Sequence, residues 1–157
     1  MTRTVSDLDK IDKQILQTLQ QRGRISNVDL SKEIDLSPTP CLERVRRLEK
    51  EGFIAKYVAL SDPAKLGLGI SAFIEVTLTN TATQDLQEFG NNMKKLPEVM
   101  ACHMVAGGFD YLIQIRVPDM SGYQRFLGEK LGTIPIVAQT HTYVVIEEVK
   151  SETALPL

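Results

Sequence analysis

The stretch SPTPCLERVRRLEKEG, residues 37–52, constrains this chain most, because it begins an arginine-rich helix with two prolines. Ser37 has the side-chain oxygen of a helix N-cap, so Pro38 takes the first helical position and Pro40 the third, where an amide has no acceptor within the helix. No helical hydrogen bond is lost, and both rings hold φ near its helical value. We therefore predict a helix with a rigid N-terminus, capped by the Ser37 side chain.

The same helix is amphipathic, and its polar side carries cations. Leu42, Val45 and Leu48 recur at three-residue intervals and form the predicted buried stripe. The side chains predicted to point outward are Thr39, Pro40, Glu43, Arg44, Arg47 and, at the margin, Arg46. Such a helix suits the DNA major groove, where arginine binds guanine or phosphate and threonine contacts a thymine methyl. A solvated basic surface is the competing interpretation, and the helices that precede this one favour the DNA-binding alternative.

Two shorter helices are predicted before residue 37. Apolar residues with helical spacing occupy residues 8–19, and Ser26 with Asp29 forms a predicted N-cap for the next helix. Residues 35–37 then give the tight turn expected between paired helices. Residues 53–60 are predicted to form one or two short strands, which would complete a winged helix-turn-helix.

The apolar pattern changes after residues 61–69, a segment with one proline and two glycines that we interpret as a hinge. Residues 70–157 show alternating and helical patterns in the order strand, helix, strand, strand, helix, strand. This order predicts a ferredoxin-like βαββαβ sandwich with both helices on one face of a four-stranded antiparallel sheet. The predicted fold class is α+β, with a DNA-binding domain at 1–60 and a second domain at 70–157.

The second face of the predicted sheet is apolar. Alternation places seven residues there: Phe73, Met100, Cys102, Met104, Leu112, Tyr143 and Val145. A patch of this kind needs a partner, and a second copy of the sheet would give a twofold dimer that also pairs two DNA-reading helices. A register shift of one residue would exchange the two faces.

Charge and composition narrow the setting. Residues 1–60 carry 11 Lys and Arg against 9 Asp and Glu, whereas residues 61–157 carry 7 against 11, as expected if only the first part meets DNA. The start of the chain lacks the apolar core of a signal peptide and nothing resembles a membrane span, so we expect a cytoplasmic, nucleoid-associated protein. Cys41 and Cys102 lie far apart without CxxC spacing, and we expect reduced thiols and no metal site.

Several motifs occur together at the spacing of one known family. They are Leu-Asp-x-x-Asp at residues 8–12, then GRISN, LSPTPCLERVRRLE and GFI, and later GGFDYLIQIRVPDMSGY and TYVVIEEVK. This set resembles the Lrp/AsnC, or feast/famine, transcription regulators over nearly the whole chain. The resemblance implies a DNA-binding half followed by an effector domain, the domain for regulation of amino-acid metabolism (RAM).

The helix pattern and the resemblance together predict two sets of site residues. The predicted DNA-binding residues are Ser37, Thr39, Pro40, Arg44, Arg46 and Arg47. The resemblance further implies an amino-acid site between dimers that stack into octamers, lined by Met104, Gly107, Asp110, Met120, Tyr143, Val144 and Val145. Gly108 is added to this set because its backbone amide could serve as a donor.

Within that site, the Asp110 carboxylate would bind the ligand's ammonium, the amides of Gly107 and Gly108 its carboxylate, and Met120 its side chain. A turn residue that satisfies local amides is the alternative role of Asp110. The expected effector is leucine, methionine or another apolar amino acid. Gly108 stands where a leucine-responsive member of the family has an acid, which leaves the identity of the amino acid open.

The predicted function is therefore a sequence-specific DNA-binding transcription regulator of amino-acid metabolism whose assembly and DNA binding respond to a small amino acid. An architectural protein that bends DNA without an effector is the alternative. An enzyme is disfavoured, because Cys102 and His103 are neighbours on a predicted strand and would point to opposite faces. His141 stands alone in the sequence, and there is no phosphate loop or HExxH motif.

Overall fold

The computed structural model describes residues 8–157, and its chain divides into two compact units. One unit holds the residues up to Leu60 together with Lys150–Leu157, and the other holds Ser61–Val149. The first seven residues of the predicted DNA-binding domain lie outside the described residues. The last segment, Lys150–Leu157, lies with the first unit, whereas the sequence-based boundary placed it in the second domain.

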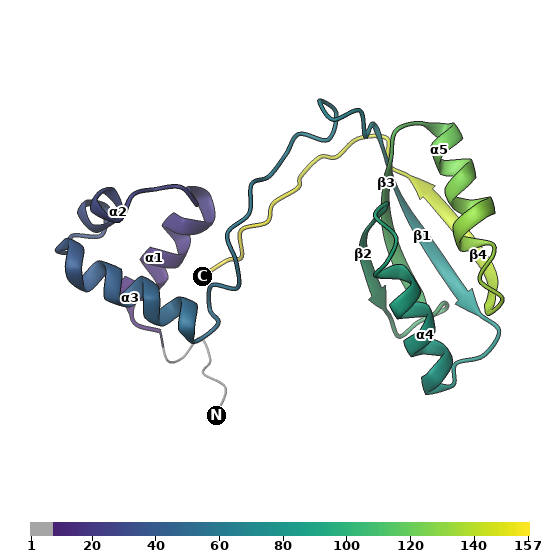
Figure 1. The fold of residues 1–157 in the computed structure, drawn as a ribbon, viewed down its shortest axis with the longest axis horizontal. Helices are drawn as coiled ribbons and strands as arrows, with labels where there is room; N and C mark the ends of the chain where they lie inside the picture. Colours follow the sequence, from purple (N-terminus) through teal and green to yellow (C-terminus); the bar gives the residue numbers. More distant parts are fainter. Residues whose placement is uncertain (1–7) are drawn as a thin grey trace. The chain divides into compact units, whose positions relative to one another are not determined.

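The described residues of the first unit form three helices (Figure 1), namely α1 (Lys10–Gln21), α2 (Asn27–Glu33) and α3 (Pro38–Lys50). The side chain of Ser26 caps α2 as predicted, accepting a hydrogen bond from the Asp29 amide at 3.1 Å. The helices share one core, built from Leu8, Ile15, Leu16, Leu30, Ile34, Cys41 and Leu48. The helix-turn-helix predicted from apolar spacing is confirmed.

The start of α3 differs from its prediction in one respect. Ser37 has the extended backbone of an N-cap, but its side chain makes no capping hydrogen bond. A capping side chain usually accepts from the amide of the second or third helical residue, and the third is Pro40, which has no N–H. Asn27 Nδ2 instead donates to the Pro38 carbonyl oxygen at 2.8 Å, which fixes the start of α3 on α2.

The predicted wing strands are wrong, because the described residues 53–60 contain no strand. Phe53 and Ile54 pack against the helical core, and the Ile54 amide donates to the Leu48 carbonyl oxygen at 3.2 Å. A strand forms only where a second segment bonds to it, and the described chain has no strand pairing with this segment. The strand propensity of residues 53–60 does not indicate whether a second segment lies beside them.

The segment predicted as a hinge, residues 61–69, contains a hydrogen-bonded turn. Asp62 Oδ1 accepts from the Ala64 amide at 2.9 Å, and the Leu68 amide donates to the Pro63 carbonyl oxygen at 2.8 Å. Gly67 has a φ of 72°, a conformation that favours glycine. The turn leads directly into the first strand of the second unit.

The second unit is a βαββαβ fold. Its elements are β1 (Ile70–Leu78), α4 (Thr83–Met93), β2 (Val99–Met104), β3 (Tyr111–Val117), α5 (Met120–Arg125), a π-helical turn (Phe126–Leu131) and β4 (Val137–Val144). The four strands are antiparallel and lie in the order β2-β3-β1-β4. This is the ferredoxin-like topology, so the predicted fold class is confirmed.

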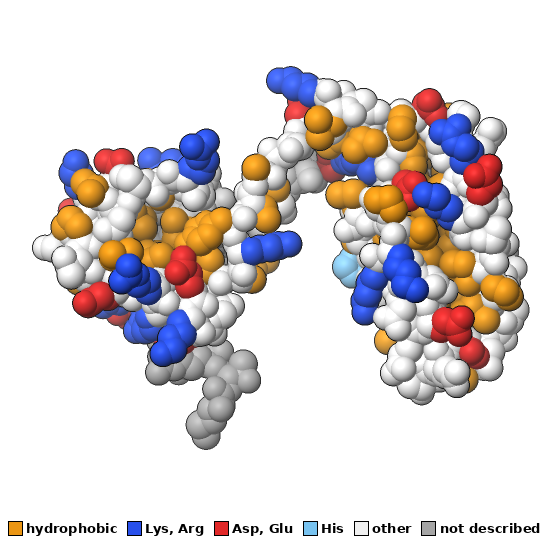
Figure 2. Space-filling view, viewed as in Figure 1, with side chains coloured by type: hydrophobic (Ala, Val, Ile, Leu, Met, Phe, Trp, Pro, Cys, Tyr) orange, Lys and Arg blue, Asp and Glu red, His pale blue; other side chains and the backbone are white. Residues whose placement is uncertain are grey.

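Both helices of the second unit cover the same face of the sheet (Figure 1). The buried cluster beneath them joins alternate residues of β1 and β3 to Phe89 and Met93 of α4 and to Phe126 and Leu131 of the π-helical turn. Figure 2 shows hydrophobic side chains between the two helices on the outer surface. The opposite face of the sheet carries no described helix.

Two residues predicted on that opposite face lie on the helical side instead. Cys102 pairs with Ile113 and Met104 pairs with Tyr111, and both of these β3 residues are buried in the core under the helices. Paired residues of an antiparallel sheet point to the same face. The prediction for Cys102 and Met104 is wrong because a β-bulge between residues 99 and 101 shifts the alternation of β2.

The open face is consequently more polar than predicted. Phe73 pairs with Tyr143, and their side chains are 36% and 55% exposed. Glu75 pairs with Leu112 on one side and with His141 on the other. The negative charge of Glu75 raises the pKa of the Tyr143 hydroxyl. Apolar side chains and ionisable groups therefore alternate on this surface.

Candidate nucleic-acid interface and ligand site

The exposed side of α3 carries one continuous polar stripe. Four exposed residues follow one another at intervals of four, three and four, namely Thr39, Glu43, Arg46 and Lys50. This spacing places them on one face of the helix. Ser37 and Pro40, at the N-terminal end of the stripe, are exposed as well. The stripe therefore offers two cations, one carboxylate and two hydroxyl groups on one accessible surface.

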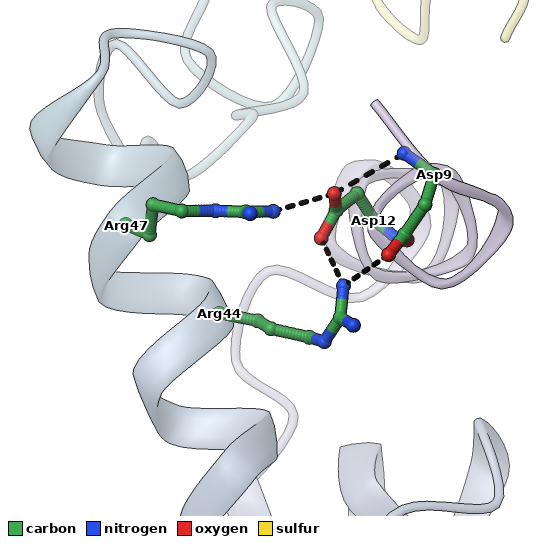
Figure 3. A network of polar contacts seen from close by, with 4 residues as sticks. All are labelled: Asp9, Asp12, Arg44 and Arg47. Atoms are coloured by element: carbon green, nitrogen blue, oxygen red, sulfur yellow. Dashed lines mark hydrogen bonds and ion pairs between the residues drawn. The ribbon is translucent and has the colours of Figure 1, made fainter. Parts of the chain in front are cut away.

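Arg44 and Arg47 reach towards α1 instead (Figure 3). Arg44 Nη1 lies 2.7 Å from Asp9 Oδ2 and 2.8 Å from Asp12 Oδ1. Arg47 Nη2 lies 2.5 Å from Asp12 Oδ2. The Asp12 side chain is 1% exposed, whereas those of Arg44 and Arg47 are 28% and 39% exposed. The four side chains form one ionic network between the two helices.

This network also forms the N-cap of α1. The Asp12 amide donates to Asp9 Oδ1 at 2.8 Å, and the Asp9 amide donates to Asp12 Oδ2 at 3.3 Å, which makes a capping box. The hydrogen bond from the Asp12 amide and that from Arg44 lower the pKa of the Asp9 carboxyl. The bond to Asp9 likewise raises the pKa of the Arg44 guanidinium. Both charged forms are therefore favoured in the folded unit.

The arrangement differs from the one expected for these arginines. From the sequence we expected Arg44 and Arg47 to point outward and Arg46 to lie at the margin, whereas Arg46 is exposed in the structure and the other two contact α1. Asp9 and Asp12 belong to the Leu-Asp-x-x-Asp motif, for which the sequence suggested no contact partner. The positions of these arginines around the helix could have shown the difference from sequence. At 3.6 residues per turn, Arg44 and Arg47 lie about 60° apart on one side of the helix, while Arg46 lies about 100° or more from either.

The predicted ligand residues near the end of β2 lie in an exposed loop. Asp110 Oδ2 accepts from the Leu78 amide at 2.7 Å, and the Asp110 amide donates to the Val76 carbonyl oxygen at 3.0 Å. The amide that Asp110 satisfies therefore belongs to β1, 32 residues earlier in the chain, and not to its own turn, and its Oδ1 accepts no hydrogen bond from residues 8–157. Gly107 and Gly108 are exposed, and their amides donate to no backbone acceptor of the described chain.

The remaining predicted ligand residues lie at the other end of the sheet. Met120 begins α5 immediately after β3, and Val144 pairs with Ala72 near the start of β1. Asp110 precedes β3, which at about 3.4 Å per residue is about 20 Å long. The predicted site residues thus form two groups: Met104, Gly107, Gly108 and Asp110 at one end, and Met120, Tyr143, Val144 and Val145 at the other. One amino acid does not bridge both groups within a single chain.

Other kinds of site find little support in the described residues. Residues 8–157 hold no group of three or more His, Cys, Asp or Glu arranged for a metal ion. Burial raises the pKa of both thiols, Cys41 and Cys102, which disfavours the reactive thiolate. None of the described helices has the length and apolar character needed to cross a membrane.

Comparison with known proteins supports a DNA-binding first unit and a ligand-binding second unit. Residues 8–55 match the winged helix-turn-helix DNA-binding family, and residues 71–155 match the Lrp/AsnC ligand binding domain. The leucine-responsive regulatory proteins of Klebsiella pneumoniae and Escherichia coli K12 are each 53% identical to the chain over 153 residues, which cover 98% of this chain and 93% of each relative. The chain belongs to the Lrp/AsnC family.

Solved structures of Lrp/AsnC proteins have the same fold. One is a transcriptional regulator from Neisseria meningitidis, solved as an L-Met complex, which is 39% identical in sequence and superposes with a TM-score of 0.91. The matched region covers 95% of this chain and 96% of the Neisseria chain. An AsnC family regulator from Agrobacterium tumefaciens is 30% identical over 95% of this chain and 97% of its own, with a TM-score of 0.91. The prediction of a DNA-binding transcription regulator with a ligand-binding domain is confirmed.

Proposed function

We propose that this Lrp/AsnC protein reads the DNA major groove with the exposed stripe of α3. Thr39 and Arg46 contact base edges, and Ser37 and Pro40 lie against the backbone at the N-terminal end of the helix. Arg44 and Arg47 act mainly as positioning residues, because their guanidinium groups are held by Asp9 and Asp12. The observation that carries this proposal is the exposure of Thr39, Glu43, Arg46 and Lys50 on one face of α3.

Replacement of Arg46 tests the stripe. Arg46→Ala should weaken binding of a specific DNA site about 5- to 150-fold, because a base contact contributes about 1–3 kcal/mol. Arg125→Ala, at an exposed arginine of the second unit, removes the same charge and should leave DNA affinity unchanged. Fluorescence anisotropy at fixed salt measures both. An equal effect of the two changes would contradict recognition by α3.

We further propose that the second unit binds an amino acid between copies of the chain. The two groups of predicted ligand residues lie at opposite ends of β3, so a complete site needs one end from each of two protomers. At one end, the free amides of Gly107 and Gly108 supply donors for a carboxylate and Asp110 Oδ1 an acceptor for an ammonium. At the other end, Met120 supplies an adaptable apolar wall, since it is 49% exposed.

The relatives indicate the class of effector. One is solved with L-Met and others are named as leucine-responsive, and we propose leucine, methionine or another apolar amino acid for this chain. Calorimetric titration with each of the twenty amino acids identifies the effector, and Asp110→Ala should abolish its heat signal while DNA affinity without effector stays constant. Silence of the wild-type protein towards all twenty would favour the architectural role instead.

Assembly provides the link between the two activities. We propose that the open face of the sheet, with Phe73, Leu112 and Tyr143, forms a twofold dimer, and that dimers join end to end into octamers through the ligand site. Light scattering during the titration should show a change in mass at the same ligand concentration as the heat signal. Effector binding and DNA binding are coupled reciprocally, so DNA should change the affinity for the effector by the same factor by which the effector changes the affinity for DNA.

We assign the chain no catalytic role and place its action at the nucleoid.

A further inference from the structure

The last residues of the chain contact α1 through side-chain amides. Gln20 Oε1 accepts from the Leu155 amide at 2.6 Å, and Gln20 Nε2 donates to the Leu155 carbonyl oxygen at 3.2 Å. Gln17 Nε2 donates to the Leu157 carbonyl oxygen at 2.9 Å. One glutamine thus binds both backbone groups of a single residue, as a neighbouring strand would.

An apolar groove lies beneath this contact. It encloses a cavity of about 300 Å³ that is lined by Leu16 and Leu19 of α1, by Phe53 and Ile54, and by Leu155 and Leu157 of the tail. Figure 2 shows hydrophobic side chains gathered around the end of the chain on this face. The groove lies wholly within the first unit, since that unit includes Lys150–Leu157.

The tail has the sequence pattern that suits this groove. Leu155 and Leu157 are two residues apart, so an extended segment presents both on the same side. Pro156, between them, has no amide hydrogen to leave unsatisfied on the opposite side. Leu157 is 38% exposed and Leu155 is 70% exposed, so Leu157 makes the larger apolar contact of the two. The occupant of the groove that these contacts specify is the chain's own C-terminal segment.

The connectivity gives this contact a consequence. Residues 145–153 continue from β4, the last strand of the second unit, and the tail then contacts the first unit. Because residues 61–69 already connect the two units along the chain, a docked tail adds a second connection between them. Two connections leave the DNA-binding unit fewer orientations relative to the second unit than one does.

We propose that residues 154–157 form a C-terminal strap, which docks on α1 of the same chain and restrains the DNA-binding unit. The strap is held by the amides of Gln17 and Gln20, which bond to the backbone of Leu157 and Leu155, and by apolar contact chiefly of Leu157. When the strap is released, the DNA-binding unit can take more orientations. DNA binding then has to restrict these orientations again, and this loss of entropy lowers the affinity for DNA. The strap thereby provides a route by which the second unit acts on α3 without touching DNA.

Hydrogen exchange of the full-length protein tests the docking. In Gln20→Ala the Leu155 amide should exchange about tenfold faster than in wild type, because two hydrogen bonds to the strap are lost. Gln21→Ala is the matched control, since Gln21 is an exposed glutamine of the same helix, and it should leave exchange unchanged. Wild-type exchange at Leu155 as fast as in a free peptide, or an unchanged rate in Gln20→Ala, would overturn the proposal.

Complementation distinguishes the chain's own tail from that of a second copy. Gln20→Ala protein, which keeps its tail, is refolded together with a variant that lacks residues 154–157 but keeps its groove. If each tail docks on its own chain, the Leu155 amide stays unprotected in the mixture. Recovered protection would show that the strap passes between copies and would overturn the intrachain assignment.

DNA affinity tests the restraint itself. Gln20→Ala should bind a specific DNA site about three- to tenfold more weakly than wild type, with Gln21→Ala unchanged. The α3 stripe is intact in both variants, so a direct loss of DNA contacts does not explain the difference. Loss of Leu155 protection with unchanged DNA affinity would overturn the restraining role, although the docked tail would stand.

Discussion

Loss of the Asp12 carboxylate should destabilise the DNA-binding unit more than any change on its surface. The Asp12 side chain is 1% exposed and accepts from Arg44 at 2.8 Å and from Arg47 at 2.5 Å. Removal of one partner from a buried ion pair typically costs about 3–5 kcal/mol. The two guanidinium groups are 28% and 39% exposed and regain water when the carboxylate is lost. We therefore expect Asp12→Ala to lower the free energy of unfolding by about 2–3 kcal/mol.

The assay must report on this unit alone, because a chain of two units need not unfold in one step. The NMR signals of Ile15 and Leu48, both fully buried in its core, serve this purpose during a urea titration. Glu43→Gln, which removes an exposed acid of α3, is the control and should change the free energy of unfolding by less than about 0.5 kcal/mol. A loss below that value in Asp12→Ala would refute a stabilising role of the network.

Three further predictions concern other charged and apolar groups. The pKa of Asp9 is lowered in the folded unit, so its contribution to stability is full above the unfolded value of about 3.8 and is lost as pH falls through the lowered pKa; urea midpoints of Asp9→Asn and wild type should differ at pH 6, and the difference should shrink as pH falls below 3.8. Burial and the hydrogen bond to Glu49 raise the pKa of Tyr57 to about 12, and absorbance at the tyrosinate band should show this late step vanish in Tyr57→Phe. Phe73→Glu places a charge on the open sheet face and should convert the proposed dimer to monomer in sedimentation, whereas an unchanged mass would place the dimer interface elsewhere.

Much of the fold follows from local sequence patterns. Apolar spacing of 3.6 residues in residues 8–48 and alternation in β1 and β3 arise from which side of a short segment is buried, and each segment carries that information itself. The two prolines of α3 similarly place its start, since Pro38 and Pro40 fit only where amides need no helical acceptor. The helix-turn-helix and the βαββαβ order were predictable for this reason.

The site depended on contacts between distant segments. Arg44 and Arg47 look like free cations in sequence, and only the packing of α3 on α1 places Asp9 and Asp12 within reach, 32 to 35 residues earlier in the chain. The bulge in β2 turned Cys102 and Met104 to the helical side, because register is set by the partner strand and not by alternation alone. The pattern of residues within α3 contains no information about the aspartates of α1, and the pattern within β2 contains none about its register with β3.

The sequence by itself determined the helix-turn-helix of the first unit, the βαββαβ order of the second and the basic character of residues 1–60. The tertiary structure decided which arginine of α3 is free, that Asp110 and Met120 lie at opposite ends of a strand, and that Leu155 meets Gln20. The physical reason is the range of the interactions concerned. Helix and strand periodicity arise between neighbours in the chain, whereas ion pairs, strand register and the docking of the tail are chosen among partners brought together only by folding.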